Sequence, residues 1–304
     1  RVLHHVRTEL LCGKAHSRFE KAQMTGQASR ERKMTHQDMT PQQRRRYNRH
    51  LILDGFGQEG QRRLLEAKVL IVGLGGLGSP VAQYLAAAGV GHLGLLDGDI
   101  VSLHNLQRQV LHNTSDIGTQ KVRSAAQKIQ ALNPDVQTTE IPLFLSEDNA
   151  LDIIRDYDFV IDGTDNFSTK YLVNDACVML GKPFCIGGIN RYAGQVMTHL
   201  PGTACYRCLF PEPPEEKDVE TCSMVGVLGP IAGMLGTVQA TEAIKCIAGI
   251  GNPLTDSLLT FDALTMQWNT FRFQHDAECA LCGDHPSITE LHEYAFMPCS
   301  KRGV

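Results

Sequence analysis

One short stretch constrains the fold of this chain more than any other: an apolar run that ends in a cluster of glycines. The run is VLIV at 69–72, and the GLGGLG that follows at 73–78 fits the pattern G-x-G-x-x-G. A short apolar run ended by glycine is typical of a buried parallel strand, and residues 79–89 resemble a helix in composition. Glycines placed between a strand and a helix allow a tight turn and the close approach of a phosphate to the helix N-terminus. The stretch therefore predicts a nucleotide-binding strand–turn–helix unit.

The rest of the chain continues this alternation. Further strands are expected at 93–96, 159–161, 183–189, 195–200, 257–263 and 267–274, and further helices at 119–132, 166–180 and 229–249. Strands that alternate with helices form a mostly parallel sheet with helices on both faces. We therefore predict an α/β fold with a Rossmann-like sheet, mixed in its C-terminal half.

We expect a single domain over residues 41–290. Residues 1–40 are polar, with apolar residues too scattered to pack, and we interpret them as a disordered leader; residues 291–304 are expected to form a loose tail. Inside the domain, residues 201–225 are rich in proline and acidic residues. That composition predicts a long mobile loop.

The overall composition excludes several classes of protein. An apolar fraction of 42% and a charged fraction of 20% are those of a soluble globular protein. A formal net charge of −4 argues against nucleic acid as the main partner. No apolar run approaches the ~18 residues of a spanning helix, and no secretory signal is recognisable. We therefore expect a cytoplasmic protein that binds neither nucleic acid nor membranes.

Charged residues downstream of the glycines indicate which nucleotide chemistry is served. Asp97 lies at the end of the second strand, where an acid can bind ribose hydroxyls. Arg108 and Lys121 add two cations, and Asp165, in the sequence DGTDN, adds a carboxylate that can bind a metal. A nucleotidyl-transfer site needs these groups to neutralise a triphosphate. The alternative that the glycines leave open is an NAD(P)-dependent oxidoreductase, for which the cations have no evident use.

Taken together, these motifs resemble the adenylation domain of the ThiF/MoeB/HesA family and of the ubiquitin-activating enzymes. The resemblance covers about residues 46–289. It is carried by RYNRH at 46–50, VGLGGLGS at 72–79, LDGD at 96–99, NLQRQ at 105–109, G-x-x-K at 118–121 and TDN at 164–166.

The resemblance implies an enzyme that uses ATP and Mg²⁺ to adenylate the C-terminal glycine of a small ubiquitin-like sulfur-carrier protein ending in Gly-Gly. Such carriers, MoaD-like or ThiS-like, serve molybdopterin or thiamin biosynthesis, and the sequence does not choose between these and other sulfur relays. A catalytically inactive binding scaffold is a further alternative, which the complete charged set disfavours.

The resemblance also implies a role for individual residues. The nucleotide is expected to contact Gly75, Gly76, Asp97, Asp99, His104, Asn105, Arg108, Lys121, Asp165 and Asn166. Within this set Asp97 would hold the ribose and Asp165 the Mg²⁺, while His104 stands where relatives commonly have a small polar residue. Arg49 would reach the ATP of the neighbouring subunit in a homodimer.

Ten cysteines are many for a reducing compartment, and four of them form two Cys-x-x-Cys pairs. Cys205 with Cys208, and Cys279 with Cys282, predict a closed tetrahedral Zn²⁺ site of structural role. The family has a similar zinc site.

The remaining cysteines divide into one candidate nucleophile and several candidate core residues. Cys222 lies where the family's transfer cysteine accepts the activated carrier. The alternative is a loop cysteine without a catalytic role, in an enzyme that leaves sulfur transfer to a separate donor such as a cysteine desulfurase or a rhodanese. Cys177, Cys185 and Cys246 are predicted to be small core residues.

Overall fold

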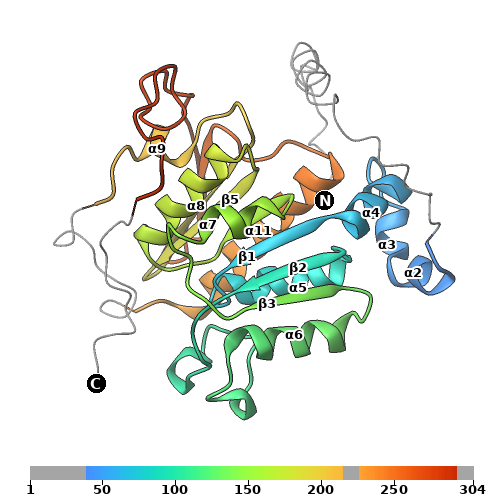
Figure 1. Ribbon diagram of the computed structural model, residues 1–304. Helices are drawn as coiled ribbons and strands as arrows, with labels where there is room; N and C mark the ends of the chain where they lie inside the picture. The colour runs from blue at the N-terminus through green and yellow to red at the C-terminus, as the bar shows by residue number, and fades with distance from the viewer. Residues whose placement is uncertain (1–38, 215–225, 293–304) are drawn as a thin grey trace, which may run out of the picture. The chain divides into compact units, whose positions relative to one another are not determined.

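The strands form one eight-stranded sheet in the computed structural model, which describes residues 39–214 and 226–292 (Figure 1). The strand order is β3-β2-β1-β4-β5-β6-β7-β8. The strands are β1 (Lys68–Val72), β2 (His92–Leu96), β3 (Gln137–Ile141), β4 (Phe159–Asp162), β5 (Phe184–Asn190), β6 (Ala193–His199), β7 (Ser257–Asp262) and β8 (Gln267–Arg272).

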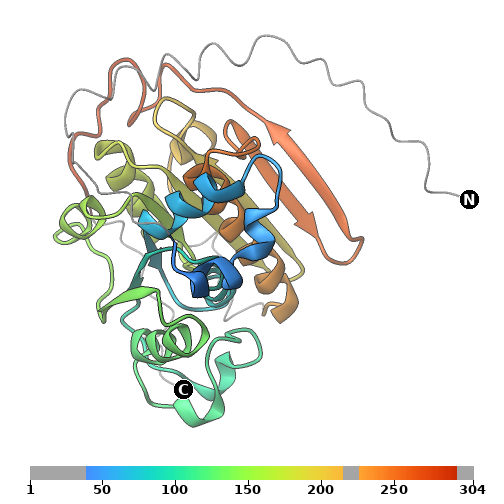
Figure 2. The same cartoon turned by 90° about the vertical axis from the view of Figure 1, so that its right-hand side faces the viewer.

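The sheet is parallel in its first half and antiparallel in its second. β1 pairs in parallel with β2 and β4, β2 with β3, and β4 with β5. From β5 onward each strand is antiparallel to the next, and Figure 2 shows the β7–β8 hairpin at the edge of the sheet. This confirms the predicted mixed sheet.

Helices cover both faces of the sheet, as predicted. They are α2 (Pro41–Arg46), α3 (Asn48–Leu51), α4 (Gly57–Glu66), α5 (Gly78–Ala88), α6 (Lys121–Leu132), α7 (Ala150–Arg155), α8 (Phe167–Met179), α9 (Tyr206–Leu209) and α11 (Gly229–Ala248), with short 3-10 helices η1 (Leu103–Asn105) and η2 (Thr114–Asp116). Side chains alternate across β1. Val69 and Ile71 therefore join the core beneath α4, α5, α6 and α11, while Leu70 and Val72 join the core beneath α7 and α8.

The structure contains elements that the sequence pattern did not reveal, among them β3, α7 and α9. β3 is an edge strand of mostly polar, exposed residues, so it lacks the apolar run by which strands are recognised. α7 has only six residues, too few for a clear helical period. The predicted loop at 201–225 contains the four-residue α9, which packs against α8. No helix in the described ranges is long and apolar enough to cross a membrane.

The core cysteines are placed as expected. Cys177 and Cys185 are fully buried, and burial raises the pKa of both thiols, so they stay protonated. Cys246 is partly buried, and burial raises its pKa to about 12. None of the three has the lowered pKa of a reactive cysteine.

Candidate nucleotide and metal sites

The carboxyl ends of β1 and β4 meet where the strand order of the sheet reverses. Ligands bind at such switch points in open α/β sheets. The glycine loop leaves β1 here, and Gly73 has a φ of 87°, in the region that favours glycine. A Cβ at Gly73 would lie 3.1 Å from the Gly163 carbonyl oxygen, and one at Gly78 would overlap the Gly73 carbonyl. Glycines therefore let the two loops lie backbone against backbone.

The carboxylate of Asp97, just after β2, organises the start of the glycine loop. Its Oδ2 accepts a hydrogen bond from the Leu74 amide at 2.8 Å, and its Oδ1 accepts from the Asp99 amide at 2.8 Å. The Lys121 ammonium, at the start of α6, donates to Asp99 Oδ2 at 2.9 Å and lies 3.6 Å from Asp97 Oδ2. Each carboxylate oxygen has a second lone pair, so Asp97 can still accept from ribose hydroxyls.

The segment between η1 and η2 returns to the glycine loop and places the side chain of Arg108 against it. Side-chain carbons of Arg108 lie 3.6 and 3.7 Å from the position that a Cβ of Gly76 would occupy. Gln109 is 4% exposed, lies beside Gly75, and its Oε1 has no hydrogen-bond partner among the described residues. Within the same ranges the amides of Gly75 and Gly76 donate no hydrogen bond. The two amides can donate to phosphate oxygens, whereas Gln109 Oε1 is an acceptor and fits a ligand group that donates.

Asp165, the predicted Mg²⁺ ligand, lies on the exposed turn between β4 and α8. Lys170 of α8 stabilises this turn. Its Nζ donates to the Thr164 carbonyl at 2.9 Å and to Oδ2 of Asp162, which is fully buried, at 2.6 Å. Asn166 caps α8, since its Oδ1 accepts from the amide three residues further on at 2.8 Å. The structure thus gives Asn166 Oδ1 a role in capping, in addition to any nucleotide contact.

His104 and Asn105 lie in η1, on the segment that leads to Arg108. His104 is exposed, and Asn105 is half-buried. The Asn105 carbonyl accepts from the amides of Arg108 and Gln109 at 3.0 and 2.9 Å, so it shapes the turn that presents Arg108. Cys222 lies outside the described residues.

Arg49 is not brought to this cluster. It is exposed in α3, two residues after the buried Tyr47, whose hydroxyl accepts from Asn133 Nδ2 at 2.9 Å and whose ring packs against Gly89. Gly89 and Asn133 follow the last residues of α5 and α6, which run from the carboxyl edge of the sheet back to its amino edge. The 11 residues of α5 span about 16 Å. The length of α5 therefore separates the segment that carries Arg49 from the glycine loop of its own subunit.

The sulfurs of Cys205, Cys208, Cys279 and Cys282 lie within 4.8 Å of one another. Individual sulfur–sulfur distances are 3.4, 3.7 and 3.9 Å, close to the ~3.8 Å that tetrahedral Zn–S bonds of about 2.3 Å impose. Hydrogen bonds with Cys208 and Cys282, together with burial, raise the pKa of Cys205 well above its usual range, whereas hydrogen bonds with Cys205 and Cys282 lower the pKa of Cys208. Without a cation, four negative charges this close together would repel one another, so the four sulfurs can all be thiolates only around a bound cation.

Buried polar groups fasten this four-cysteine site to α8. Arg207 donates from Nε and Nη2 to the two oxygens of Asp175, each at 2.8 Å. The Tyr206 amide donates to Asn174 Oδ1 at 2.8 Å. Bidentate pairing of this kind is strong and directional. Since α8 begins at the turn that carries Asp165, the metal site and the nucleotide edge share one helix.

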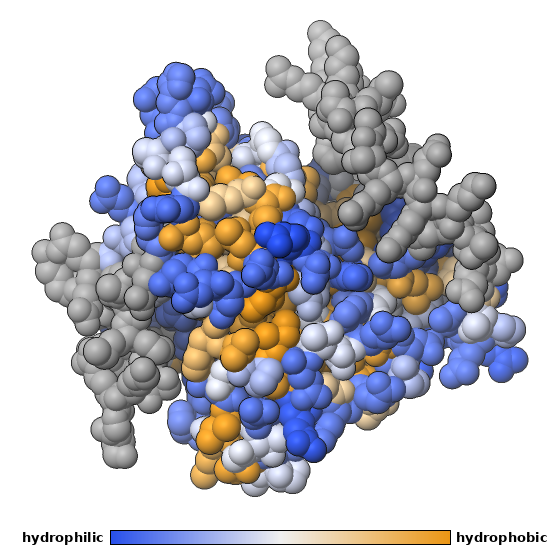
Figure 3. Space-filling view, in the orientation of Figure 1, coloured by the Kyte–Doolittle hydropathy of each residue, from blue (hydrophilic) through white to orange (hydrophobic). Residues whose placement is uncertain are grey.

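An exposed aromatic side chain, that of Phe144, lies at the nucleotide edge. Figure 3 shows apolar side chains in a band that runs from α7 and α8 toward β3. Phe144, which follows β3, is 56% exposed, and its ring lies over Gly98, next to Asp97. An aromatic ring beside the carboxylate predicted to bind ribose is placed to stack on a base.

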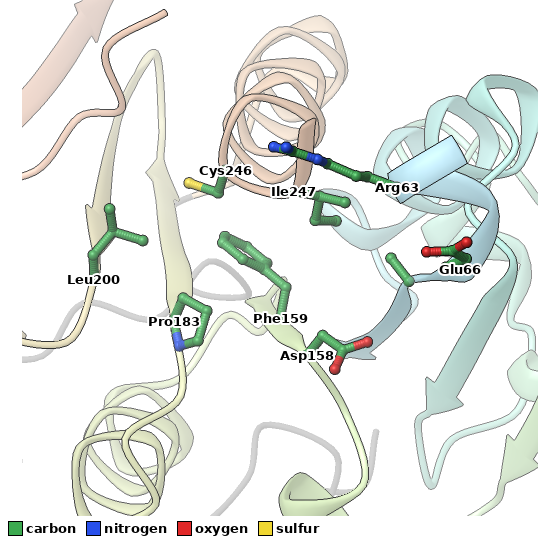
Figure 4. A pocket seen from close by; sticks show the side chains of 9 residues that line it. Arg63, Glu66, Asp158, Phe159, Pro183, Leu200, Cys246 and Ile247 are labelled. Carbon is green, nitrogen blue, oxygen red and sulfur yellow. The ribbon is translucent and has the colours of Figure 1, made fainter. Parts of the chain in front are cut away.

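A cavity of about 290 Å³ opens at the opposite edge of the sheet. Ala67, Phe159 and Pro183, at the starts of β1, β4 and β5, identify this as the amino edge. The cavity is therefore separate from the nucleotide cluster. Its lining consists of Arg63, Glu66, Ala67, Asp158, Phe159, Pro183, Leu200, Cys246 and Ile247 (Figure 4).

Sequence reasoning missed several side chains at the two sites, because no local pattern shows which groups they contact. They are Gln109, His112, Asp162, Lys170, Asp175 and Arg207. One signal was available: Arg207 stands inside a Cys-x-x-Cys pair, and a charged residue buried beside a metal site needs a partner of opposite charge.

Comparison with known proteins identifies relatives over most of the chain. A model described as the ThiF family matches residues 47–281. A sulfur carrier protein adenylyltransferase of Thermus thermophilus is 47% identical over 255 residues, which are 82% of this chain and 94% of the relative. The adenylyltransferase and sulfurtransferase MOCS3 of Mus musculus is 47% identical over 251 residues, 82% of this chain. The chain spans 55% of the length of that relative.

Solved structures share the fold. A crystal structure of E. coli MccB with succinimide superposes with a TM-score of 0.70 at 24% identity, over 78% of this chain and 74% of that one. E. coli MccB with ATP gives a TM-score of 0.67 at 24% identity, over 74% of this chain and 69% of that one.

Proposed function

This chain belongs to the ThiF family, and from that membership and the geometry of the nucleotide edge we propose that it is an adenylyltransferase. Its substrates would be ATP and the C-terminal glycine carboxylate of a small ubiquitin-like sulfur-carrier protein ending in Gly-Gly. The observation that carries the proposal is the gathering of Asp97, Arg108, Lys121 and Asp165 at one edge of the sheet. The alternative, an NAD(P)-dependent oxidoreductase, is disfavoured because the relatives of this chain are named adenylyltransferases.

The reaction needs charge neutralisation more than proton transfer. The carrier's terminal carboxylate is already ionised at pH 7. One of its oxygens attacks the α-phosphorus, the bond from that phosphorus to the bridging oxygen breaks, and pyrophosphate leaves. Arg108, above Gly76, and the amides of Gly75 and Gly76, which donate to no acceptor among the described residues, are positioned to bind phosphate oxygens. Donors fixed in advance stabilise the charge that develops in the transition state.

Two metal ions complete the proposal. Asp165 would hold Mg²⁺, which neutralises the phosphates of ATP when it is bound. Its position fits, because its carboxylate is exposed at the carboxyl edge on a turn braced by Lys170. The four cysteines fit Zn²⁺ in number, donor type and spacing.

We further propose that the enzyme works as a homodimer in which Arg49 serves the partner's site. The support is the location of Arg49 at the amino edge of its own sheet, with the length of α5 between it and its own glycine loop. A guanidinium held away from the phosphate site of its own subunit can bind phosphate bidentately in another.

The fate of the activated carrier forms the last part of the proposal. Cys222 would accept the carrier, or a separate cysteine desulfurase or rhodanese would supply the sulfur directly. The described cysteines are free thiols gathered as metal ligands or buried in the core, which accords with a reducing, cytoplasmic compartment. The pathway would be molybdopterin or thiamin biosynthesis, or another sulfur relay that uses the same kind of carrier.

The test is ATP–pyrophosphate exchange with the purified chain and a panel of Gly-Gly carriers. Exchange that depends on one carrier, and that is lost when its last glycine is removed, would support adenylation and identify the substrate. Absence of exchange with every carrier, together with tight binding of NAD(P), would refute the proposal in favour of hydride transfer.

A further inference from the structure

A buried histidine that the proposed chemistry does not use connects the glycine loop to α6. His112 is 4% exposed. Its Nε2 lies 3.0 Å from the Leu74 carbonyl oxygen, and its Nδ1 lies 2.8 Å from Ser124 Oγ. Leu74 belongs to the glycine loop, and Ser124 is one turn into the helix that begins with Lys121. The imidazole therefore joins two parts of the nucleotide cluster without itself lying at the surface.

The hydrogen-bond partners of the imidazole determine which of its two nitrogens carries a proton. A carbonyl oxygen only accepts, so the hydrogen bond to Leu74 requires a proton on Nε2. Burial lowers the pKa of His112, and the charges that face it are Lys121 on α6 and the carboxylates of Asp97 and Asp116. The lowered pKa keeps the ring neutral. The Ser124 hydroxyl has one proton and two acceptors within reach, His112 Nδ1 at 2.8 Å and Asp116 Oδ2 at 3.0 Å. A neutral ring with its proton on Nε2 needs the hydroxyl proton at Nδ1, and Asp116 Oδ2 then keeps its hydrogen bond from Lys128.

The hydrogen bond to Leu74 has a consequence for the next peptide group. In a trans peptide the C=O and the N–H point in opposite directions. The Leu74 carbonyl points inward to His112, so the Gly75 amide of the same peptide points away from His112. The Leu74 amide is held by Asp97 at 2.8 Å. Both polar groups of Leu74 are therefore fixed, and the Gly75 amide, which donates no hydrogen bond within the described ranges, is left facing outward.

We propose that His112 is a positioning residue for the nucleotide: it holds the Leu74–Gly75 peptide so that the Gly75 amide faces the phosphates, and Ser124 fixes the tautomer that this requires. His112 does not touch the nucleotide. The inference rests on the proposed function only in taking ATP as the ligand. A residue that merely filled space would be replaceable by any side chain of its size, whereas a positioning donor is replaceable only by another donor.

Three variants separate these roles. His112→Phe keeps the ring volume and removes the donor, His112→Gln keeps an N–H donor at a similar reach, and Ser124→Ala leaves the tautomer unfixed. His92→Phe is the matched control, because His92 also makes one side-chain hydrogen bond, to Thr139 at 2.8 Å, but at the amino edge of the sheet. ATP affinity with Mg²⁺ is measured by calorimetry on the full chain, with a thermal melt for each variant.

We expect His112→Phe to weaken ATP binding about tenfold, as loss of the partner of a buried carbonyl implies. His112→Gln should remain within about threefold of the unmodified chain, Ser124→Ala should fall between these two, and His92→Phe should bind normally. Histidine ¹⁵N spectra of the unmodified chain should show a neutral ring protonated on Nε2. Wild-type affinity in a folded His112→Phe, no rescue by Gln relative to Phe, or a proton on Nδ1 would each overturn the inference. If His112→Phe does not fold, the Gln and Ala variants and the spectrum decide. Failure of the unmodified chain to bind ATP would instead refute the proposed function.

Discussion

The nucleotide edge and the four-cysteine lobe, which comprises residues 205–209 and 279–288, differ in what holds their side chains in place. The nucleotide edge lies at the end of the parallel half of the sheet, above two large cores, one on each face. Among the described residues, the small core around the four cysteines has three buried apolar side chains, those of Cys205, Cys279 and Leu281, while Tyr206 belongs to the core beneath α8. Two of these three belong to the cluster that could hold a metal ion. We therefore expect the lobe to depend on a bound metal and on the Arg207–Asp175 pair for the order that the nucleotide edge obtains from apolar packing.

This difference predicts that damage to the two regions will have different effects. At the nucleotide edge a substitution on the rim should remove activity and leave stability unchanged, because the core beneath is intact. In the lobe a substitution of a ligand should remove stability first. The regions are nonetheless joined, since Asp175 anchors the lobe to α8 and α8 begins at the Asp165 turn.

The largest expected effect is on activity. Asp165→Ala should lower ATP–pyrophosphate exchange by about a hundredfold or more, as loss of a group that neutralises transition-state charge implies. The melting temperature and the zinc content should stay at wild-type values. Exchange at the wild-type rate would remove Asp165 from the mechanism, and a large loss of zinc in this variant would show that the two regions are not separable.

The second effect is on stability. Cys282→Ser should lose stoichiometric metal and lower the melting temperature by roughly 10 °C, because metal binding contributes folding free energy. Metal content is measured by emission spectroscopy after careful purification. Cys246→Ser, a cysteine outside the metal site, is the control and should retain the metal. Absence of zinc from the unmodified chain would contradict the assignment of the site.

A third test sharpens the position of Arg49, at the edge opposite the nucleotide. Arg49→Ala and Asp165→Ala homodimers should each be inactive. In a mixed dimer both lesions fall in one site, so the other site is complete. Random exchange of equal amounts should restore roughly a quarter of wild-type activity, as a symmetric dimer with two sites implies. No recovery after demonstrated subunit exchange would show that Arg49 does not act across the interface.

The smallest expected effect is on the pH dependence of stability. Burial lowers the pKa of His112 in the folded chain, so the unfolded chain binds more protons as pH falls through about 6.5. The contribution of His112 is fully present above that pH and decreases below it. His112→Gln should therefore flatten the fall in unfolding free energy between about pH 7 and pH 5, measured by urea titration. An unchanged pH slope would show that His112 does not titrate in this range.

Most of the nucleotide edge could be read from the sequence because its parts are local and periodic. The glycine loop, the strand before it and the acid at the end of the next strand are linked by short, regular spacings. His112 and Lys170 could not be found in this way. Each donates a hydrogen bond to a backbone carbonyl oxygen, which carries no sequence signal. The partner of His112 is also 38 residues away and is fixed only when separate segments pack together.

The sequence by itself determined the α/β class, the mixed sheet, the order of the main elements and the identity of four potential metal ligands. These follow from apolar periodicity, glycine placement and the chemistry of thiolates, all of which are local properties. Only the tertiary structure decided that Arg49 lies at the edge opposite its own glycine loop, that Arg207 pairs with Asp175, and that His112 holds the Leu74 carbonyl. These depend on which segments the sheet order makes neighbours, and a contact between residues that lie far apart in the chain is fixed by packing rather than by any local pattern.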